Sequence, residues 1–255
     1  KKYIYYTINP REQLFKQLSG FLYFLRKANI SKKILVLPRF ELNNKFYNYS
    51  ELFDYGKIND NFNIITYDKY IYISASDPII GENSEAYISG FWQFPFNTHN
   101  ETTRNEYMYY RKHVSFHDKY FKLAPLRNES YLAVHWRQDD FLKIRPQVVL
   151  SKEDLVIYIK LKLKELNINS VYISTDSKNM NDIEYIRKNL PTFSYKDTFD
   201  DNMDYDILES IICTQSDYFI GTDTSLYSTY IMGERIKMGY TKDKQEIKLN
   251  KSNKL

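Results

Sequence analysis

The chain has 255 residues, enough for one large domain or two modest ones, and its 43% hydrophobic and 27% charged residues exclude extended disorder. The net charge of +4 is small and many lysines fall in the final KLNKSNKL, which we expect to be a frayed tail, so a nucleic-acid-binding role ranks last. The lone Cys213 allows no intrachain disulfide, and without a secretory segment or an apolar run of ~18 residues the chain predicts a soluble, cytoplasmic protein with no membrane span.

The first third of the chain predicts a strand, a helix and a second strand. KYIYYTI at 2–8 is rich in aromatic and β-branched residues and ends at the turn signal Asn9-Pro10. Apolar residues then recur at helical spacing from Arg11 to Ala28, and ILVLP at 34–38 is a continuous apolar run typical of a buried parallel strand. Residues 41–125 give weaker signals: the short runs NIITY and YIYIS, the aromatic stretch FWQFPF, and a polar helical segment over about 101–122.

After residue 126 strands and helices alternate clearly. We predict strands at YLAVHW, VYIST and DYFIG, and helices over about 151–166, 180–189, 204–215 and from Ser225 onward. Ser151 is placed to cap the first of these helices. Both halves therefore have the α/β pattern, which predicts two Rossmann-like domains over residues 1–125 and 126–255.

The segment YLAVHWRQDDF at 131–141 predicts a buried strand that runs into a loop. His135 and Arg137 are two positions apart, so they share a face if the strand continues, at the carboxyl end where open α/β sheets bind ligands. The rigid fork of an arginine can hold two phosphate oxygens and stabilise charge on a departing nucleotide. The alternative is a surface arginine beside a packed histidine. We interpret Asp140 as shaping the loop rather than binding a metal.

Three further features carry candidate chemistry. The hydroxyl-rich turn of FIGTDTSLYS opens a helix whose free N–H groups can bind phosphate, although its Thr and Ser residues could simply cap that helix. Glu209 could accept the N1–H and N2–H of guanine, or could be a solvated helix residue. Glu12, in the loop after the first strand, could be a general base, or could only favour the dipole of the next helix.

These motifs, taken in order, resemble the protein O-fucosyltransferases, particularly the type 2 branch. The resemblance rests on VHWRQDDF, the following Arg145, ISTD at 173–176, FIGTDTSLYS, and the N-terminal YIYYTINPRE and ILVLPRF, and it leaves out roughly 57–125. It implies a GT-B-like fold in which residues 1–125 form the acceptor-side domain and residues 126–255 bind the nucleotide sugar across a cleft.

The resemblance also assigns roles to single residues. Arg137 would hold the diphosphate and act in catalysis, His135 would contact the nucleotide, Glu209 would replace the family's guanine-binding aspartate, and Glu12 would deprotonate the acceptor. The remaining donor-binding residues would come from the turn: Thr224, Ser225, Leu226 and Tyr227.

The chain departs from the family pattern in places that bear on its substrates. Leu226 stands where the family has a threonine and Tyr227 where it has a phenylalanine, so one phosphate-binding hydroxyl is absent. The loop carrying Glu12 is shorter, the middle region is reduced, and the family's disulfide cysteines are missing. These changes shift the expected acceptor from a folded secreted module toward a glycan or another hydroxyl.

We therefore expect an inverting, metal-independent glycosyltransferase that needs no cofactor and moves a sugar, by default fucose from GDP-fucose, to a glycan or protein hydroxyl. The alternatives are a transferase of another nucleotide sugar such as xylose or rhamnose, and a non-catalytic sugar-nucleotide-binding protein, which the altered Glu12 loop would favour.

Overall fold

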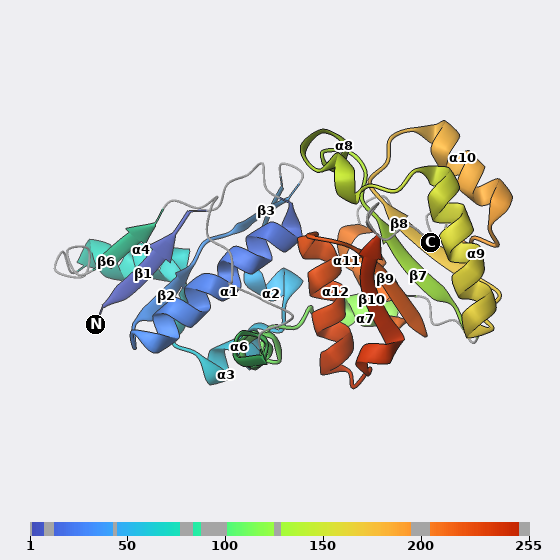
Figure 1. The fold of residues 1–255 in the computed structure, drawn as a ribbon. Helices are drawn as coiled ribbons and strands as arrows, with labels where there is room; N and C mark the ends of the chain where they lie inside the picture. The colour runs from blue at the N-terminus through green and yellow to red at the C-terminus, as the bar shows by residue number, and fades with distance from the viewer. Residues whose placement is uncertain are drawn as a thin grey trace. The chain divides into compact units, whose positions relative to one another are not determined.

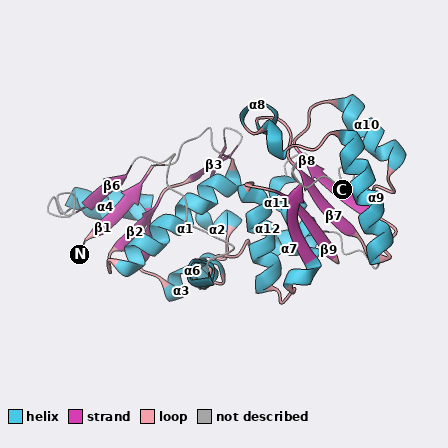
Figure 2. Cartoon of the chain, in the orientation of Figure 1, coloured by secondary structure: helices cyan, strands magenta, loops and turns pink. Residues whose placement is uncertain are grey.

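A computed structural model describes residues 2–7, 13–42, 45–76, 84–87, 101–124, 129–194 and 205–249. The chain divides into two compact units, residues 1–119 and 120–255. Each unit contains a four-stranded sheet whose strands all pair in parallel, with helices packed against it (Figure 1). Figure 2 shows the same alternation of strands and helices in both units, which have the predicted α/β class.

The sheet of the first unit has the strand order β5-β2-β1-β6. Its two faces are covered by different helices: Tyr3 of β1 packs on Tyr70 of α4, whereas Tyr6 stacks on Phe24 of α1 with ring centroids 4.2 Å apart. The elements are β1 (Tyr3–Tyr6), α1 (Leu14–Ile30), β2 (Ile34–Leu37), β3 (Phe40–Leu42), β4 (Lys45–Tyr47), α2 (Tyr49–Leu52), α3 (Tyr55–Asn61), β5 (Ile64–Thr66), α4 (Tyr67–Ser76), β6 (Ser84–Tyr87), α6 (Glu101–Arg111) and α7 (Asp118–Leu123), the last of which runs into the second unit.

The sheet of the second unit has the strand order β10-β9-β7-β8. Its elements are β7 (Leu132–Trp136), α8 (Phe141–Ile144), the 3-10 turn η1 (Pro146–Val148), α9 (Lys152–Leu166), β8 (Val171–Thr175), α10 (Met180–Asn189), α11 (Tyr205–Gln215), β9 (Tyr218–Thr222), α12 (Leu226–Lys237), the 3-10 turn η3 (Lys242–Lys244) and β10 (Gln245–Leu249). The strands and helices predicted after residue 126 all form within a residue or two of their expected positions.

Side-chain alternation along β7 decides what each face of this sheet contacts. Leu132, Val134 and Trp136 point into a core shared with α9 and α10. The intervening His135 points to the opposite face, where it contacts α12. Figure 1 shows α9 and α10 on one side of the sheet and α11 and α12 on the other. The carboxyl end of β7 therefore delivers a polar side chain to the α12 side.

The expected frayed tail is partly wrong, because Lys248 and Leu249 belong to β10, which pairs in parallel with β9. Backbone hydrogen bonding along the open edge of β9 is available to any sequence, and lysine content alone does not oppose it. The stretch FWQFPF and residues 250–255 lie outside the described residues. Among the residues that are described, no helix is long and apolar enough to cross a lipid bilayer.

Candidate functional site

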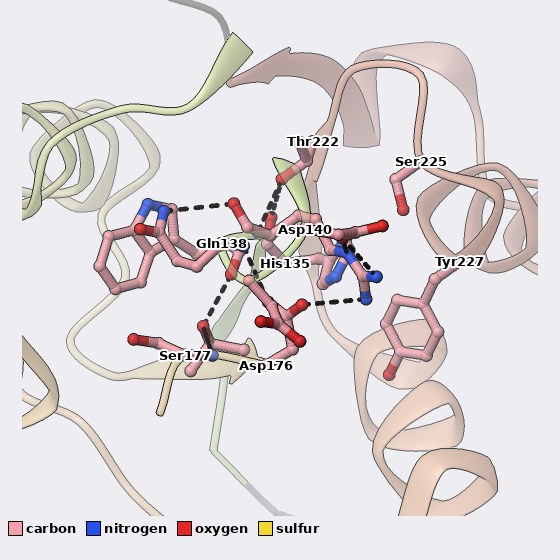
Figure 3. Close-up of polar contacts among 12 residues, drawn as sticks. His135, Gln138, Asp140, Asp176, Ser177, Thr222, Ser225 and Tyr227 are labelled. Atoms are coloured by element: carbon pink, nitrogen blue, oxygen red, sulfur yellow. Dashed lines mark hydrogen bonds and ion pairs between the residues drawn. The ribbon is translucent and has the colours of Figure 1, made fainter. Parts of the chain in front are cut away.

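The candidate site lies at the carboxyl edge of the second sheet, where β7, β8 and β9 end. β7 is fully buried, and register pairing places His135 beside Ser174 and Trp136 beside Thr175 of β8. Arg137 is the first residue after β7 and Asp176 is the first residue after β8. Because the strands are parallel, these side chains emerge at one edge of the sheet (Figure 3).

Thr222, the last residue of β9, holds the chain at the point where β7 ends. Its hydroxyl donates to the carbonyl oxygen of His135 at 2.7 Å and accepts from the backbone N–H of Arg137 at 3.1 Å (Figure 3). The side chain thus replaces the ladder hydrogen bonds that a longer strand would supply. This fixes the backbone on both sides of Trp136.

The imidazole of His135 is buried, with 4% of its surface exposed. Its Nδ1 lies 2.8 Å from the hydroxyl of Ser228 on α12, and its ring packs against Tyr227 with centroids 4.6 Å apart. Burial lowers the pKa of His135 from 6.5 to about 3, and the nearby charge of Arg137 acts in the same direction. The ring is therefore neutral at physiological pH.

The guanidinium of Arg137 is held between two carboxylates. Nε and Nη2 donate to one oxygen of Asp140 at 3.1 and 2.8 Å, and Nη1 lies 3.1 Å from Oδ2 of Asp176. The arginine side chain is only 13% exposed, and it lies over the ring of Phe141 at 5.5 Å. The observed pairing agrees with the interpretation of Asp140 as a residue that shapes the loop.

Asp176 is the site residue to which sequence reasoning assigned no role. One of its oxygens accepts from the backbone N–H of Gln138 at 2.7 Å, so it orders the loop after β7 as well as the arginine. Burial raises the pKa of Asp176, while the amide of Gln138 and the charge of Arg137 oppose that shift. The available signal in the sequence was the position of Asp176 directly after the predicted buried strand VYIST.

The turn between β9 and α12 carries four of the expected donor-binding residues, of which Tyr227 packs against His135. Thr224 is exposed and has a left-handed backbone with φ of 60°, and its carbonyl oxygen accepts from Arg145 at 3.2 Å. Ser225 caps α12, since its hydroxyl accepts from the N–H of Ser228 at 3.4 Å. Leu226 and Tyr227 are half-buried in the first turn of the helix. The capping role expected as the alternative is thus present.

Glu209 on α11 lies deeper along the same face of the sheet. Its two carboxylate oxygens accept from the hydroxyls of Tyr172 at 2.9 Å and Ser174 at 3.3 Å. The Ser174 hydroxyl lies a further 3.3 Å from that of Tyr227, which connects Glu209 to the α12 turn. Glu209 also lines a pocket of about 610 Å³, whose wall includes Tyr172, Thr175, Ser177, Arg187 and Phe193.

The structure thus brings His135, Arg137 and the turn residues together, with Glu209 connected through Ser174. Glu12, expected as the general base, lies outside the described residues, so its position carries no test. Within the described ranges, no group of three or more His, Cys, Asp or Glu side chains is arranged to hold a metal ion.

Comparison with known proteins shows which protein family this chain is similar to. The model of the family described as GDP-fucose protein O-fucosyltransferase matches residues 75–238, more than half of the chain. GDP-fucose protein O-fucosyltransferase 2 of Plasmodium berghei (strain Anka) is 27% identical over 188 residues, covering 71% of this chain and 38% of that protein. The Homo sapiens protein of the same name is 31% identical over 124 residues, covering 46% of this chain and 29% of that protein. The chain thus spans about a third of the length of these curated relatives.

Solved structures agree on the fold. The crystal structure of POFUT1 in complex with GDP-fucose matches with a TM-score of 0.69 and 16% identity, over 92% of this chain and 94% of that one. The structure of NodZ alpha-1,6-fucosyltransferase soaked with GDP-fucose matches with a TM-score of 0.57 and 10% identity, over 91% and 92% of the two chains. The predicted α/β fold class of the GT-B-like type is confirmed.

Proposed function

Because this chain belongs to the GDP-fucose protein O-fucosyltransferase family, we propose that it is an inverting, metal-independent glycosyltransferase that moves fucose from GDP-fucose to a glycan or protein hydroxyl. The chain covers only part of its curated relatives, so activity, donor and acceptor are all part of the proposal. The cytoplasmic location expected from its single cysteine likewise stays a prediction.

The observation that carries the proposal is the fixed guanidinium of Arg137 at the carboxyl edge of the sheet. A guanidinium has five N–H donors, and its contacts with Asp140 and Asp176 do not use all of them. The two carboxylates hold the fork in one orientation, which lowers the entropy lost when a diphosphate binds. In this proposal Arg137 stabilises the negative charge that grows on the departing GDP.

The phosphates would also meet the first turn of α12. At this turn Thr224 is exposed, Ser225 is buried and caps the helix, and the N-terminal end of the 12-residue helix α12 favours an anion. A neutral His135 would add a hydrogen bond beside Arg137. In this proposal the diphosphate contacts Arg137, His135 and the start of α12.

We place the guanine of the donor in the pocket beside Glu209. A carboxylate can accept two hydrogen bonds from N1–H and N2–H of guanine, whereas adenine and uracil cannot offer that pair of donors. Tyr172 and Ser174 hold the Glu209 carboxylate from the sheet side, which fixes its orientation. The aromatic rings of Tyr172 and Phe193 supply apolar wall for the base.

The test is GDP release from GDP-fucose in the presence of glycan and peptide acceptors. Arg137→Ala should lower the rate by about 100-fold or more while the protein remains folded, since removing one charge-stabilising group typically costs that much. Arg137→Lys keeps the charge but loses the fork and should fall between wild type and Arg137→Ala. The matched control is Arg39→Ala, which breaks an exposed ion pair with Asp68 in the first unit. Equal rates for Arg137→Ala and wild type would contradict the proposal.

The role of Glu12 as the general base is tested by a separate variant. Glu12→Gln should lower the rate by about 100-fold or more, as loss of a general base does, and leave GDP affinity unchanged. A rate that is unaffected would remove Glu12 from the mechanism. A fall in GDP affinity of the same size would instead place Glu12 in donor binding.

The sugar itself is the least constrained part of the proposal. Leu226 replaces the family's threonine beside Ser225, which changes the contacts available next to the phosphates. A panel of GDP-sugars and UDP-sugars, including xylose and rhamnose donors, scored by nucleotide release, distinguishes fucose from these alternatives. Tight GDP binding with no turnover on any donor and acceptor would favour a non-catalytic binding protein.

A further inference from the structure

Ser228 is a fully buried serine on α12 whose hydroxyl lies between β9 and the candidate site. Its oxygen accepts from the backbone N–H of Thr222 at 3.0 Å and lies 2.8 Å from Nδ1 of His135. The helix approaches β9 closely at this point, because a Cβ at Gly221 would lie 2.8 Å from Cβ and 2.9 Å from Oγ of Ser228. The position of the hydroxyl is therefore determined by backbone packing rather than by a free rotamer.

The direction of the hydrogen bond to His135 follows from a count of donors and acceptors. The Thr222 amide can only donate, so it occupies one lone pair of the Ser228 oxygen. Among the described residues, Nδ1 of His135 is the one recorded acceptor within reach of the Ser228 hydroxyl hydrogen. If Nδ1 carried a proton, that buried hydroxyl would have no acceptor, which is unfavourable.

From this geometry we propose that Ser228 is a positioning residue, which fixes His135 as the tautomer protonated on Nε2. The Nε2–H group can then donate a hydrogen bond to the phosphates of the nucleotide sugar. The contact with the nucleotide rests on the proposed function, whereas the tautomer of the free protein does not depend on it. No partner for Nε2 is recorded within the described part of the chain.

The tautomer changes what His135 can do. With Nε2 protonated, the neutral ring offers a donor beside the guanidinium of Arg137, and both groups then favour an anion. With Nδ1 protonated, Nε2 would present a lone pair to the same anion and oppose binding. Burial holds the pKa of His135 at about 3, so the ring gives this hydrogen bond without taking up a proton over the physiological range.

A purely structural role for Ser228, as a bridge between β9 and α12, predicts the same loss of stability on mutation but no change of tautomer. The chain has four histidines, so nitrogen NMR of the free protein can resolve the ring signals, with His135→Gln providing the assignment. In wild type we expect Nε2 to be protonated and Nδ1 to be an acceptor. A wild-type ring protonated on Nδ1 overturns the proposal outright.

The decisive variant is Ser228→Ala, with Ser210→Ala as its control. Ser210 is also fully buried on a helix, and its hydroxyl donates to the carbonyl oxygen of Ile207 in its own helix at 2.6 Å rather than to His135. Ser228→Ala should populate the Nδ1-protonated tautomer and weaken GDP binding by about three- to tenfold, the effect of one hydrogen bond. Ser210→Ala should change neither readout. Should Ser228→Ala fail to fold, Ser228→Cys keeps a weaker donor on a somewhat larger atom, and should shift the tautomer partially.

The outcomes separate this proposal from the one on which it rests. If wild type binds no GDP, donor binding fails, while the tautomer of the free protein still decides what Ser228 does. If Ser228→Ala changes the tautomer and GDP affinity stays the same, Ser228 does not serve the site. If neither changes, Ser228 is only a packing residue.

Discussion

His135 carries a chemical group that the fold keeps neutral. Its imidazole is buried between β7 and α12, and its pKa falls from 6.5 to about 3, chiefly through burial. The unfolded chain takes up a proton at this residue as the pH drops below about 6.5, whereas the folded chain does not until about 3. His135 therefore costs folding stability at acidic pH and nothing above neutral pH.

This difference in proton uptake makes the free energy of unfolding depend on pH. Between pH 7 and pH 5 the contribution of His135 should lower the free energy of unfolding by about 2 kcal/mol, since the unfolded state alone gains the proton. Urea denaturation of wild type and His135→Gln across this range measures how the difference between their free energies of unfolding changes with pH. Between pH 7 and pH 8 that difference should stay constant. Parallel curves for the two proteins down to pH 5 would show that the folded imidazole titrates normally.

Thr224 shows that backbone strain has been retained at the candidate site. A β-branched residue in the left-handed region is rare, and such a conformation costs about 1–2 kcal/mol. Thr224→Asn should raise the free energy of unfolding by about 1 kcal/mol, because asparagine adopts this conformation more readily. If the Thr224 hydroxyl contacts phosphate as proposed, the same variant weakens GDP binding. A less stable variant would contradict the account of strain.

The roles that could be predicted from sequence are those that depend on local spacing. His135 and Arg137 follow from a buried strand and its end, and the capping of α12 by Ser225 follows from a hydroxyl before an apolar helix. Asp176 was given no role from sequence, and Ser228 was expected only as one of the hydroxyls of the turn, not as the partner of His135. Their contacts depend on which strands are neighbours and how closely α12 approaches β9, which no local pattern encodes.

At the level of elements, the close approach of α12 to β9 aligns the site. Gly221→Ala should cost about 1–3 kcal/mol of stability, because the new methyl group would overlap Ser228. The matched control is Gly56→Ala in α3, where the nearest atom is 3.6 Å away and alanine should stabilise the helix slightly. Equilibrium unfolding of both variants checks the opposite signs. A neutral Gly221→Ala would mean that the helix can move away without cost.

The elements that sequence predicts well are the long amphipathic helices and the buried parallel strands. α9 forms over Lys152–Leu166 with the predicted Ser151 cap, which accepts from the N–H of Asp154. Residues 41–125 are harder to predict, because most of their elements are short. The run YIYIS is aromatic and β-branched, yet it lies in α4, where Tyr70 packs on the sheet of the first unit. Tertiary contacts decide the structure of such a segment.

For the whole molecule, the described residues that we propose to bind the donor all belong to the second unit, residues 120–255. GDP should therefore slow amide hydrogen exchange in the loop after β7, at the end of β8 and in the first turn of α12. The strands β1, β2 and β5 should exchange equally with and without GDP, because no donor contact is proposed there. Protection that appears mainly in those three strands would place the nucleotide in the first unit, contrary to the account.

The most direct test of the central claim is calorimetric titration of the full chain with GDP, UDP and their sugars. We predict that GDP and GDP-fucose bind and that UDP does not. We also predict that Arg137→Ala loses most of the affinity, and that Glu209→Ala reduces the preference for GDP over UDP. Equal affinity for GDP and UDP, or undiminished GDP binding by Arg137→Ala, would contradict that claim.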